Sequence, residues 1–345
     1  MTNKIRIEPS GHEFHAEPGE TVLEAALRAG LNLPYGCRSG ACGACKGKLL
    51  AGSVHYGDNQ PAGLTPEDRA AGLALFCQAI PEGDLTIEVK EVGTVQEIAV
   101  KTMPARVARM ERLADDVMRL CLKLPDAQRL QFLAGQYIDI ILKDGSRRGF
   151  SIANAPHDDE FIELHIRHVP GGRFTHHVFT GMKEKDILRI EGPLGSFFLR
   201  EESRRPIILM GGGTGFAPLK GMIEHAFHIG LGRPMHLFWG VRAKRDLYLH
   251  ELALGWAERH PDFRYTPVLS DPQPEDRWQG ETGFVHEAVV RAYRDLSGHQ
   301  VYMSGPPAMI NAARKAFLEH GLSEEHLFYD SFEFAAQPKA AAEAN

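Results

Sequence analysis

Apolar and polar positions follow three different patterns along the chain, and each pattern predicts a different kind of sheet. Between residues 1 and 92, alternating runs at Ile5–Ile7 and Leu85–Val89 are typical of half-buried strands. A helix is predicted from Glu20, with Gly30 at its C-terminal end. A hairpin turn is expected at Ser10-Gly11. This first segment is therefore expected to be a small sheet with one helix.

The middle segment, residues 102–202, is a succession of short apolar runs separated by turns. The runs lie at 117–124, 137–142, 161–166 and 187–190. Short strands at this spacing indicate an antiparallel barrel, here of six strands. Residues 93–101 have no helical period and are expected to link the two units. Cys121 lies in the first run and is expected to be a small buried core residue.

The last segment, residues 203–335, contains continuous apolar runs instead. Runs at 206–210 and 235–240 predict buried parallel strands. A glycine-rich turn follows the first run, and a helical pattern then extends from Pro218 to His228. Strand, glycine turn and helix together form the context in which a dinucleotide places its phosphates on backbone amides. We expect a parallel α/β domain here and a disordered tail at 336–345.

Composition and charge narrow the class of protein. The chain has 345 residues, 43% of them hydrophobic, which suits two or three domains that each bury a core. A net charge of -6 argues against nucleic acid as a partner. No run of about 18 apolar residues is present, so no membrane span is expected. The N-terminal residues show no apolar signal region, and a cytoplasmic location is expected.

Four cysteines carry the most specific chemistry. Cys37, Cys42 and Cys45 lie in one glycine-rich loop, and Cys77 follows much later. The spacing C-x4-C-x2-C with a distant fourth cysteine is that of plant-type ferredoxins, which bind a 2Fe-2S cluster. The alternative is a structural zinc site, but such sites usually have two C-x2-C pairs and this chain has one. The pattern favours the cluster as the metal site.

With these cysteines, residues 1–92 resemble the plant-type ferredoxin family. The resemblance implies a β-grasp fold, in which a small sheet and one helix support the cluster loop. Such a cluster carries one electron at a time. A cluster of this kind therefore needs an electron donor and an electron acceptor.

The barrel segment resembles the flavin domain of the ferredoxin reductase family. The run Arg148-Gly149-Phe150-Ser151 is similar to the family's R-x-Y-S segment, with phenylalanine in place of tyrosine. The resemblance implies that Arg148 pairs with the flavin pyrophosphate, Phe150 stacks on the flavin, and Ser151 bonds its reactive edge. A second run, 169–175, is similar to the family's G-G-x-x-S segment, although a plain turn between strands would also explain it. The flavin-binding residues so implied are Arg148, Gly149, Phe150, Ser151, Ile166, Gly171, Gly172 and Thr175.

The last segment resembles the nicotinamide domain of the same family. Residues 211–221 are similar to its G-G-T-G-x-A-P-x-x-G, and 304–307 to its C-G-P-P with serine replacing cysteine. The residues implied for nucleotide binding are Gly212, Gly213, Thr214, Gly215, Arg242, Ser304, Gly305 and Pro306. Phe332 is expected to cover the flavin face, with Phe334 in reserve, although a core phenylalanine is the alternative. Catalytic roles are thereby implied for Ser151, Thr214, Ser304 and Phe332.

Over residues 1–334 the chain resembles reductases built from an N-terminal ferredoxin, an FAD barrel and a nicotinamide domain. The resemblance implies an NADH-dependent enzyme that passes electrons through FAD and the 2Fe-2S cluster to a protein acceptor. The likeness is greatest to the CDP-6-deoxy-Δ3,4-glucoseen reductase group, whose acceptor is a pyridoxamine-phosphate dehydrase. The reductase components of bacterial dioxygenases and monooxygenases, which serve an iron oxygenase, are the alternative. A non-catalytic redox sensor is an alternative of another class, and only Ser304 favours it.

The choices of NADH over NADPH and of FAD over FMN depend on the resemblance. Arg242, Lys244 and Arg245 lie where a 2′-phosphate would be recognised, and Asp246 offsets them. From the resemblance we expect NADH rather than NADPH, and FAD rather than FMN.

Overall fold

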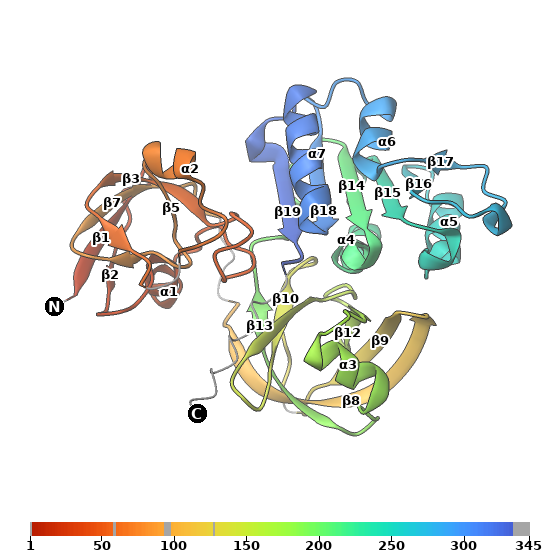
Figure 1. The fold of residues 1–345 in the computed structure, drawn as a ribbon, viewed down its shortest axis with the longest axis horizontal. Coiled ribbons are helices and arrows are strands. Elements are labelled where there is room, and N and C mark those ends of the chain that lie inside the picture. The colour runs from red at the N-terminus through yellow and green to blue at the C-terminus, as the bar shows by residue number, and fades with distance from the viewer. Residues whose placement is uncertain (1, 58–59, 93–97, 127, 334–345) are drawn as a thin grey trace, which may run out of the picture.

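The computed structural model describes residues 2–57, 60–92, 98–126 and 128–333, and they form three large sheets in chain order and one two-stranded sheet (Figure 1). The first sheet has the strand order β2-β1-β7-β3-β5, with helix α1 packed against it. Its members are β1 (Asn3–Glu8), β2 (Glu13–Ala16), α1 (Val22–Arg28), β3 (Lys46–Ala51), β5 (Leu73–Leu75) and β7 (Leu85–Glu88). The short α2 (Pro66–Ala70) and the pair β4 (Val54–His55) and β6 (Ile80–Pro81) complete this N-terminal unit, which has the predicted β-grasp arrangement.

The second sheet is the predicted antiparallel barrel of six strands. Its order is β11-β10-β13-β8-β9-β12, and a bridge between Ile152 and Leu164 links the two end strands. Its members are β8 (Lys101–Ala114), β9 (Val117–Lys123), β10 (Tyr137–Ile141), β11 (Arg147–Ser151), β12 (Ile162–Arg167), α3 (Arg173–Thr180) and β13 (Ile187–Leu194). Ile138 and Ile140 point into its core, so the alternate residues Tyr137 and Asp139 point outward. Cys121 is buried, as predicted.

The third sheet is parallel throughout, in the order β17-β16-β15-β14-β18-β19. Its strands are β14 (Ile207–Gly212), β15 (Met235–Val241), β16 (Phe263–Leu269), β17 (Glu281–Thr282), β18 (Gln300–Gly305) and β19 (Leu327–Ser331). The helices α4 (Phe216–His228) and α5 (His250–Arg259) cover one face. The helices α6 (Val285–Ala292) and α7 (Pro307–Glu319) cover the other. Each residue of β14 is buried, as expected for a central parallel strand.

The strand order decides where a ligand can bind to this sheet. Chain order runs outward in one direction from β14 to β17, and in the other from β18 to β19. The carboxyl ends of β14 and β18 therefore flank the point at which the order reverses, which is where open α/β sheets bind ligands. Within the described residues, no helix is long and apolar enough to cross a membrane.

A buried ionic network joins the barrel to helix α4. The carboxylate of Glu163 on β12 lies 2.8 Å from His165 Nε2 and 3.4 Å from the ammonium of Lys220. Lys220 is buried and also contacts Glu224 at 2.9 Å, while His165 Nδ1 lies 3.0 Å from the hydroxyl of Tyr248. Burial alone would raise the pKa of Glu163, but the hydrogen bond from His165 and the charge of Lys220 hold it at about 2.

We predict that Glu163→Gln loses more stability at neutral pH than in acid. Since the pKa of Glu163 is depressed from 4.5, its contribution is complete above that pH and is lost as the pH falls toward about 2. At pH 7 the shift corresponds to about 3 kcal/mol. Thermal unfolding measured against pH should show a gap between wild type and variant that narrows in acid. The exposed pair of Glu201 with His225 provides the control, and Glu201→Gln should change little. A gap for Glu163→Gln that is independent of pH would contradict the assignment.

Candidate redox site

The four cysteines form two pairs in the N-terminal unit. The amide of Cys37 donates to Cys42 Sγ over 3.4 Å, and the amide of Cys42 donates to Cys37 Sγ over 3.3 Å. The pKa of the Cys45 thiol is lowered chiefly by the neighbouring Cys77 thiol, and both residues are buried. No three metal-binding side chains among the described residues are arranged around one point for a single ion. Two pairs of thiols fit a 2Fe-2S cluster, whose two irons share four protein ligands.

The segment expected to hold the flavin lies on strands β10 and β11. Ile138 and Phe150 are cross-strand partners, so Phe150 lies on the core side, where its ring contacts Phe174 at 5.5 Å between centroids. Arg148 lies on the same side of β11, and its guanidinium donates to the carbonyl of Arg147 over 2.7 Å. Neighbouring Arg147 points the other way and pairs with Glu191 at 2.6 Å. The two adjacent arginines are thus separated onto opposite faces.

The second predicted flavin segment is a turn followed by a helix, not a plain turn. Gly172 starts α3 without a side-chain cap, so the first amides of the helix point out of the turn. The hydroxyl of Thr175 accepts from the amide of Val169 over 3.1 Å and donates to carbonyls of the same loop. Thr175 therefore shapes the turn. The side chain of Ile166 is fully buried in the barrel core, which leaves only its backbone available to a ligand.

Ser151 reaches the parallel sheet. Its hydroxyl donates to Asp330 Oδ2 on β19 over 3.0 Å, across 179 positions of sequence. Burial raises the pKa of Asp330 to about 6, against the lowering effect of this hydrogen bond. Phe332 follows two residues later, and its amide donates to the carbonyl of Gly305 over 2.9 Å. The predicted residues Ser151, Gly305 and Phe332 are thereby brought together, and Asp330 joins them. Phe334 lies outside the described residues.

The glycine turn after β14 meets the end of β18 at very short range. A Cβ added to Gly215 would lie 2.0 Å from the carbonyl oxygen of Ser304. Ser304 is fully buried, and its hydroxyl has no hydrogen-bond partner among the described residues. The indole of Trp239 on β15 donates to the carbonyl of Gly213 over 2.9 Å, which holds the turn in place. The predicted residues Gly212–Gly215 and Ser304–Pro306 thus pack directly against one another at the switch point.

One arginine from the barrel reaches this turn and was missed from the sequence. A Cβ added to Gly213 would lie 2.6 Å from Arg167 Nη1, so the guanidinium rests against the backbone of the turn. Arg167 also lies 3.1 Å from Asp116. The arginine follows Ile166 directly, but its contact with a segment some forty residues away left no local signal.

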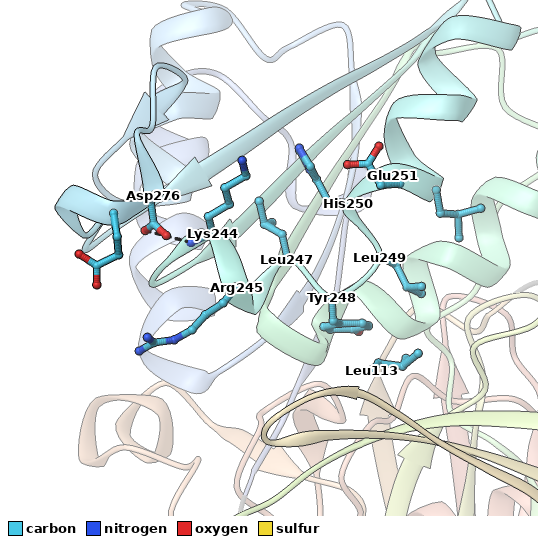
Figure 2. A pocket seen from close by; sticks show the side chains of 11 residues that line it. Leu113, Lys244, Arg245, Leu247, Tyr248, Leu249, His250, Glu251 and Asp276 are labelled. Atoms are coloured by element: carbon cyan, nitrogen blue, oxygen red, sulfur yellow. Dashed lines mark hydrogen bonds between the residues drawn. The ribbon is translucent and has the colours of Figure 1, made fainter.

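A cavity of about 580 Å³ lies between the barrel and the loops of the parallel sheet (Figure 2). Leu113 comes from the barrel side, while Lys244, Arg245, Glu275 and Asp276 come from loops after β15 and β16. Asp276 accepts from the amides of Gln273 and Lys244 at 2.9 and 3.3 Å. Arg242 is exposed and does not line the cavity.

Two thiol pairs, a barrel with an arginine-bearing edge, and a glycine turn at a parallel-sheet switch point together define an iron–sulfur flavoprotein reductase. Family models agree segment by segment: the 2Fe-2S iron-sulfur cluster binding domain at 5–82, the oxidoreductase FAD-binding domain at 104–199 and the oxidoreductase NAD-binding domain at 209–315. The enzyme's cofactors are accordingly a 2Fe-2S cluster, FAD and NAD(H).

Full-length relatives share this organisation. The CDP-6-deoxy-L-threo-D-glycero-4-hexulose-3-dehydrase reductase of Yersinia pestis is 41% identical over 332 residues, which is 96% of this chain and 99% of the relative. The phenol hydroxylase P5 protein of Acinetobacter pittii is 36% identical, over 99% and 97% of the two chains. The crystal structure of an Amycolatopsis cytochrome P450 reductase matches with a TM-score of 0.80 and 37% identity, over 96% and 99%. The chain belongs to this family of reductases with an N-terminal ferredoxin domain.

We predict that Gly215→Ala impairs nucleotide binding without removing the other cofactors. The added methyl group would collide with the backbone of β18, so the turn must move. NADH titration of the purified variant should show at least about tenfold weaker binding, because misplaced amides lose their bonds to phosphate. Visible spectra should still show flavin and cluster. Gly298→Ala, where an added Cβ meets nothing, is the control. Unchanged NADH affinity in Gly215→Ala would contradict this geometry.

Proposed function

We propose that this enzyme delivers electrons from NADH to a pyridoxamine-phosphate-dependent dehydrase that acts on a nucleotide-linked deoxyhexulose. The supporting observation is the 41% identity, over nearly the whole of both chains, to a reductase named for a CDP-hexulose 3-dehydrase. Relatives named for phenol hydroxylase and terephthalate dioxygenase are 36% identical over similar lengths. An iron oxygenase component is therefore the alternative acceptor.

The site residues divide into three sets under this proposal. Cys37, Cys42, Cys45 and Cys77 hold the cluster. Arg148, Phe150 and the first amides of α3 hold the flavin. Gly212–Gly215 and Ser304–Pro306 receive the nicotinamide nucleotide, with Arg167 as an added cation beside the turn. A flavin held by the second set would supply the chemistry that converts the hydride of NADH into single electrons for the cluster.

The chain's own residues orient these groups. The hydroxyl of Ser151 is held by Asp330, so its position at the flavin strand depends on the C-terminal segment. The buried hydroxyl of Ser304 is free to bond to a nucleotide that enters the turn. The backbone of Phe332 is bonded to Gly305, which supports its assignment as the residue that covers the flavin face. Ser151, Thr214, Ser304 and Phe332 remain the residues to which we assign contact with the reacting groups.

NADH is the expected donor because the cavity lined by Lys244 and Arg245 carries more acids than these two cations, since Glu251 adds to Glu275 and Asp276. Lys244 and Arg245 face Glu275 and Asp276 there, and the Asp276 carboxylate is held by two amides. The 2′-phosphate of NADPH would be repelled by these carboxylates. In the double variant Arg242→Ala with Lys244→Ala, the ratio of kcat/KM for NADH to that for NADPH should change by less than about threefold. The control is Arg291→Ala, because Arg291 pairs with Glu281 and lies outside this cavity. A sharp rise in the ratio would show that the two cations had served a phosphate.

The cluster is predicted to be the exit for electrons. In Cys45→Ser the cluster loses one buried ligand, so cytochrome c reduction should fall by more than about tenfold. Ferricyanide reduction, which the flavin supports alone, should remain. Cys121→Ser, in the barrel core, is the matched control and should keep both activities. Normal cytochrome c reduction by Cys45→Ser would mean that electrons leave by another route.

The acceptor can be tested with purified proteins. Immobilised enzyme should capture a pyridoxamine-phosphate dehydrase from its host lysate. That dehydrase, once purified, should stimulate NADH oxidation in the presence of its sugar-nucleotide substrate. Stimulation by an iron oxygenase component instead would replace the acceptor while leaving the electron route intact. Turnover limited to one equivalent of NADH with every acceptor would favour a redox sensor.

A further inference from the structure

The cluster loop is docked on the flavin barrel through a backbone contact at Tyr35. The amide of Tyr35 donates to the hydroxyl of Ser196 over 2.9 Å. In return, the amide and hydroxyl of Ser196 both donate to the carbonyl of Tyr35, at 3.0 and 2.8 Å. These residues are 161 positions apart, and each belongs to a different domain. In Figure 1 the loops of the N-terminal unit accordingly extend toward β10, β13 and β19.

A tyrosine of the barrel contacts the residue that precedes the first thiol. The hydroxyl of Tyr137, the first residue of β10, donates to the carbonyl of Gly36 over 2.8 Å. Gly36 precedes Cys37, and a Cβ added to Gly36 would lie 3.2 Å from Cys42 Sγ. The tyrosine hydroxyl is therefore bonded to the residue that directly precedes the first cluster ligand.

The barrel leaves a slot for this ring. A Cβ added to Gly195 would lie 2.8 Å from Tyr137 Cδ1, and one added to Gly149 would lie 3.5 Å from Cδ2. Gly195 also has a positive φ of 91°, and its carbonyl accepts from the side chain of Gln136 over 3.0 Å. With both edges of the ring bounded in this way, the direction of the hydroxyl is set by the barrel.

Charged and apolar contacts surround the same point. Arg38 of the cluster loop lies 3.4 Å from Glu191 of β13, which also pairs with Arg147. Leu194, at the end of β13, packs into the hydrophobic core of the N-terminal unit. The loop is thus held by hydrogen bonds, an ion pair and apolar packing, all on the outward face of strands β10 and β13.

We propose that Tyr137 is a positioning residue that holds the cluster loop in a set position against the flavin-binding strands. Its partner across the strand pair is Ser151, the residue assigned to the flavin edge. One side chain therefore links the place where an electron leaves the flavin to the place where the cluster gains it. Tyr137 itself neither gives nor takes an electron. The inference rests on the proposed route from flavin to cluster.

Tyr137→Phe keeps the ring and removes the single hydrogen bond to Gly36. Hydrogen exchange of peptides that cover Tyr35 and Ser196 should accelerate by about fivefold to tenfold, as expected for one lost bond. After anaerobic mixing with NADH, flavin bleaching should keep its rate. Reduction of the cluster, followed by its visible and EPR signals, should slow by about the same factor.

The control is Tyr293→Phe, which loses a hydroxyl bonded to His236 far from this junction and should match wild type in both measurements. Wild-type exchange, or faster exchange with an unchanged rate of cluster reduction, in Tyr137→Phe would overturn the proposal. Ser196→Ala offers a second test, because it removes two of the bonds at Tyr35 and should shift both measurements in the same direction. Absence of cluster reduction in the wild type would instead overturn the proposed electron route.

Discussion

Everything in this molecule depends on bringing a two-electron donor and a one-electron carrier to opposite sides of one flavin site. We propose that the strand pair β10–β11 is where the two meet. Its paired residues Tyr137 and Ser151 extend to different domains, one to the carbonyl of Gly36 and the other to the carboxylate of Asp330. Because the two residues are cross-strand partners, a shift of either neighbouring domain would disturb a contact at the other. The barrel is thus the fixed frame for both transfers.

The two domain junctions are built from different interactions. The barrel meets the nicotinamide domain through buried charges, with Lys220 between Glu163 and Glu224. Such a network is costly to disrupt, because each partner would leave another charge buried. The barrel meets the ferredoxin domain through neutral hydrogen bonds at Tyr35 and Gly36 and one ion pair at Arg38. Individually these bonds are modest in energy, and the apolar packing of Leu194 adds to them, so the second junction depends on several weak contacts and not on buried charge.

The sequence predicted the parts whose signal is local. Alternation and glycine spacing identified the three sheets, and cysteine spacing identified four residues that the structure gathers into two pairs. The helix α3 was missed because its eight residues follow a turn that reads as a simple strand connection. Thr175 is predicted to bind the flavin, and in the structure its hydroxyl bonds to its own loop.

What the sequence could not supply were contacts between distant segments. Asp330, Arg167 and Tyr137 each act at a site more than forty positions away, and none belongs to a motif. Their roles depend on which faces of three separate sheets meet. Strand periodicity indicates that Tyr137 and Ile138 point in opposite directions, but not what lies opposite either of them. The packing of the domains decides which residues lie opposite them, and no single segment of the sequence encodes that packing.

The most direct test of the electron route compares intact protein with protein that has lost its flavin but kept its cluster. Both are mixed anaerobically with NADH, and the EPR signal of the reduced cluster is followed over time. The geometry predicts that the signal develops in the intact protein after the flavin is bleached, and that it is absent without flavin and returns when FAD is restored. Reduction of the cluster by NADH in the flavin-free protein would contradict the order of transfer inferred from this structure.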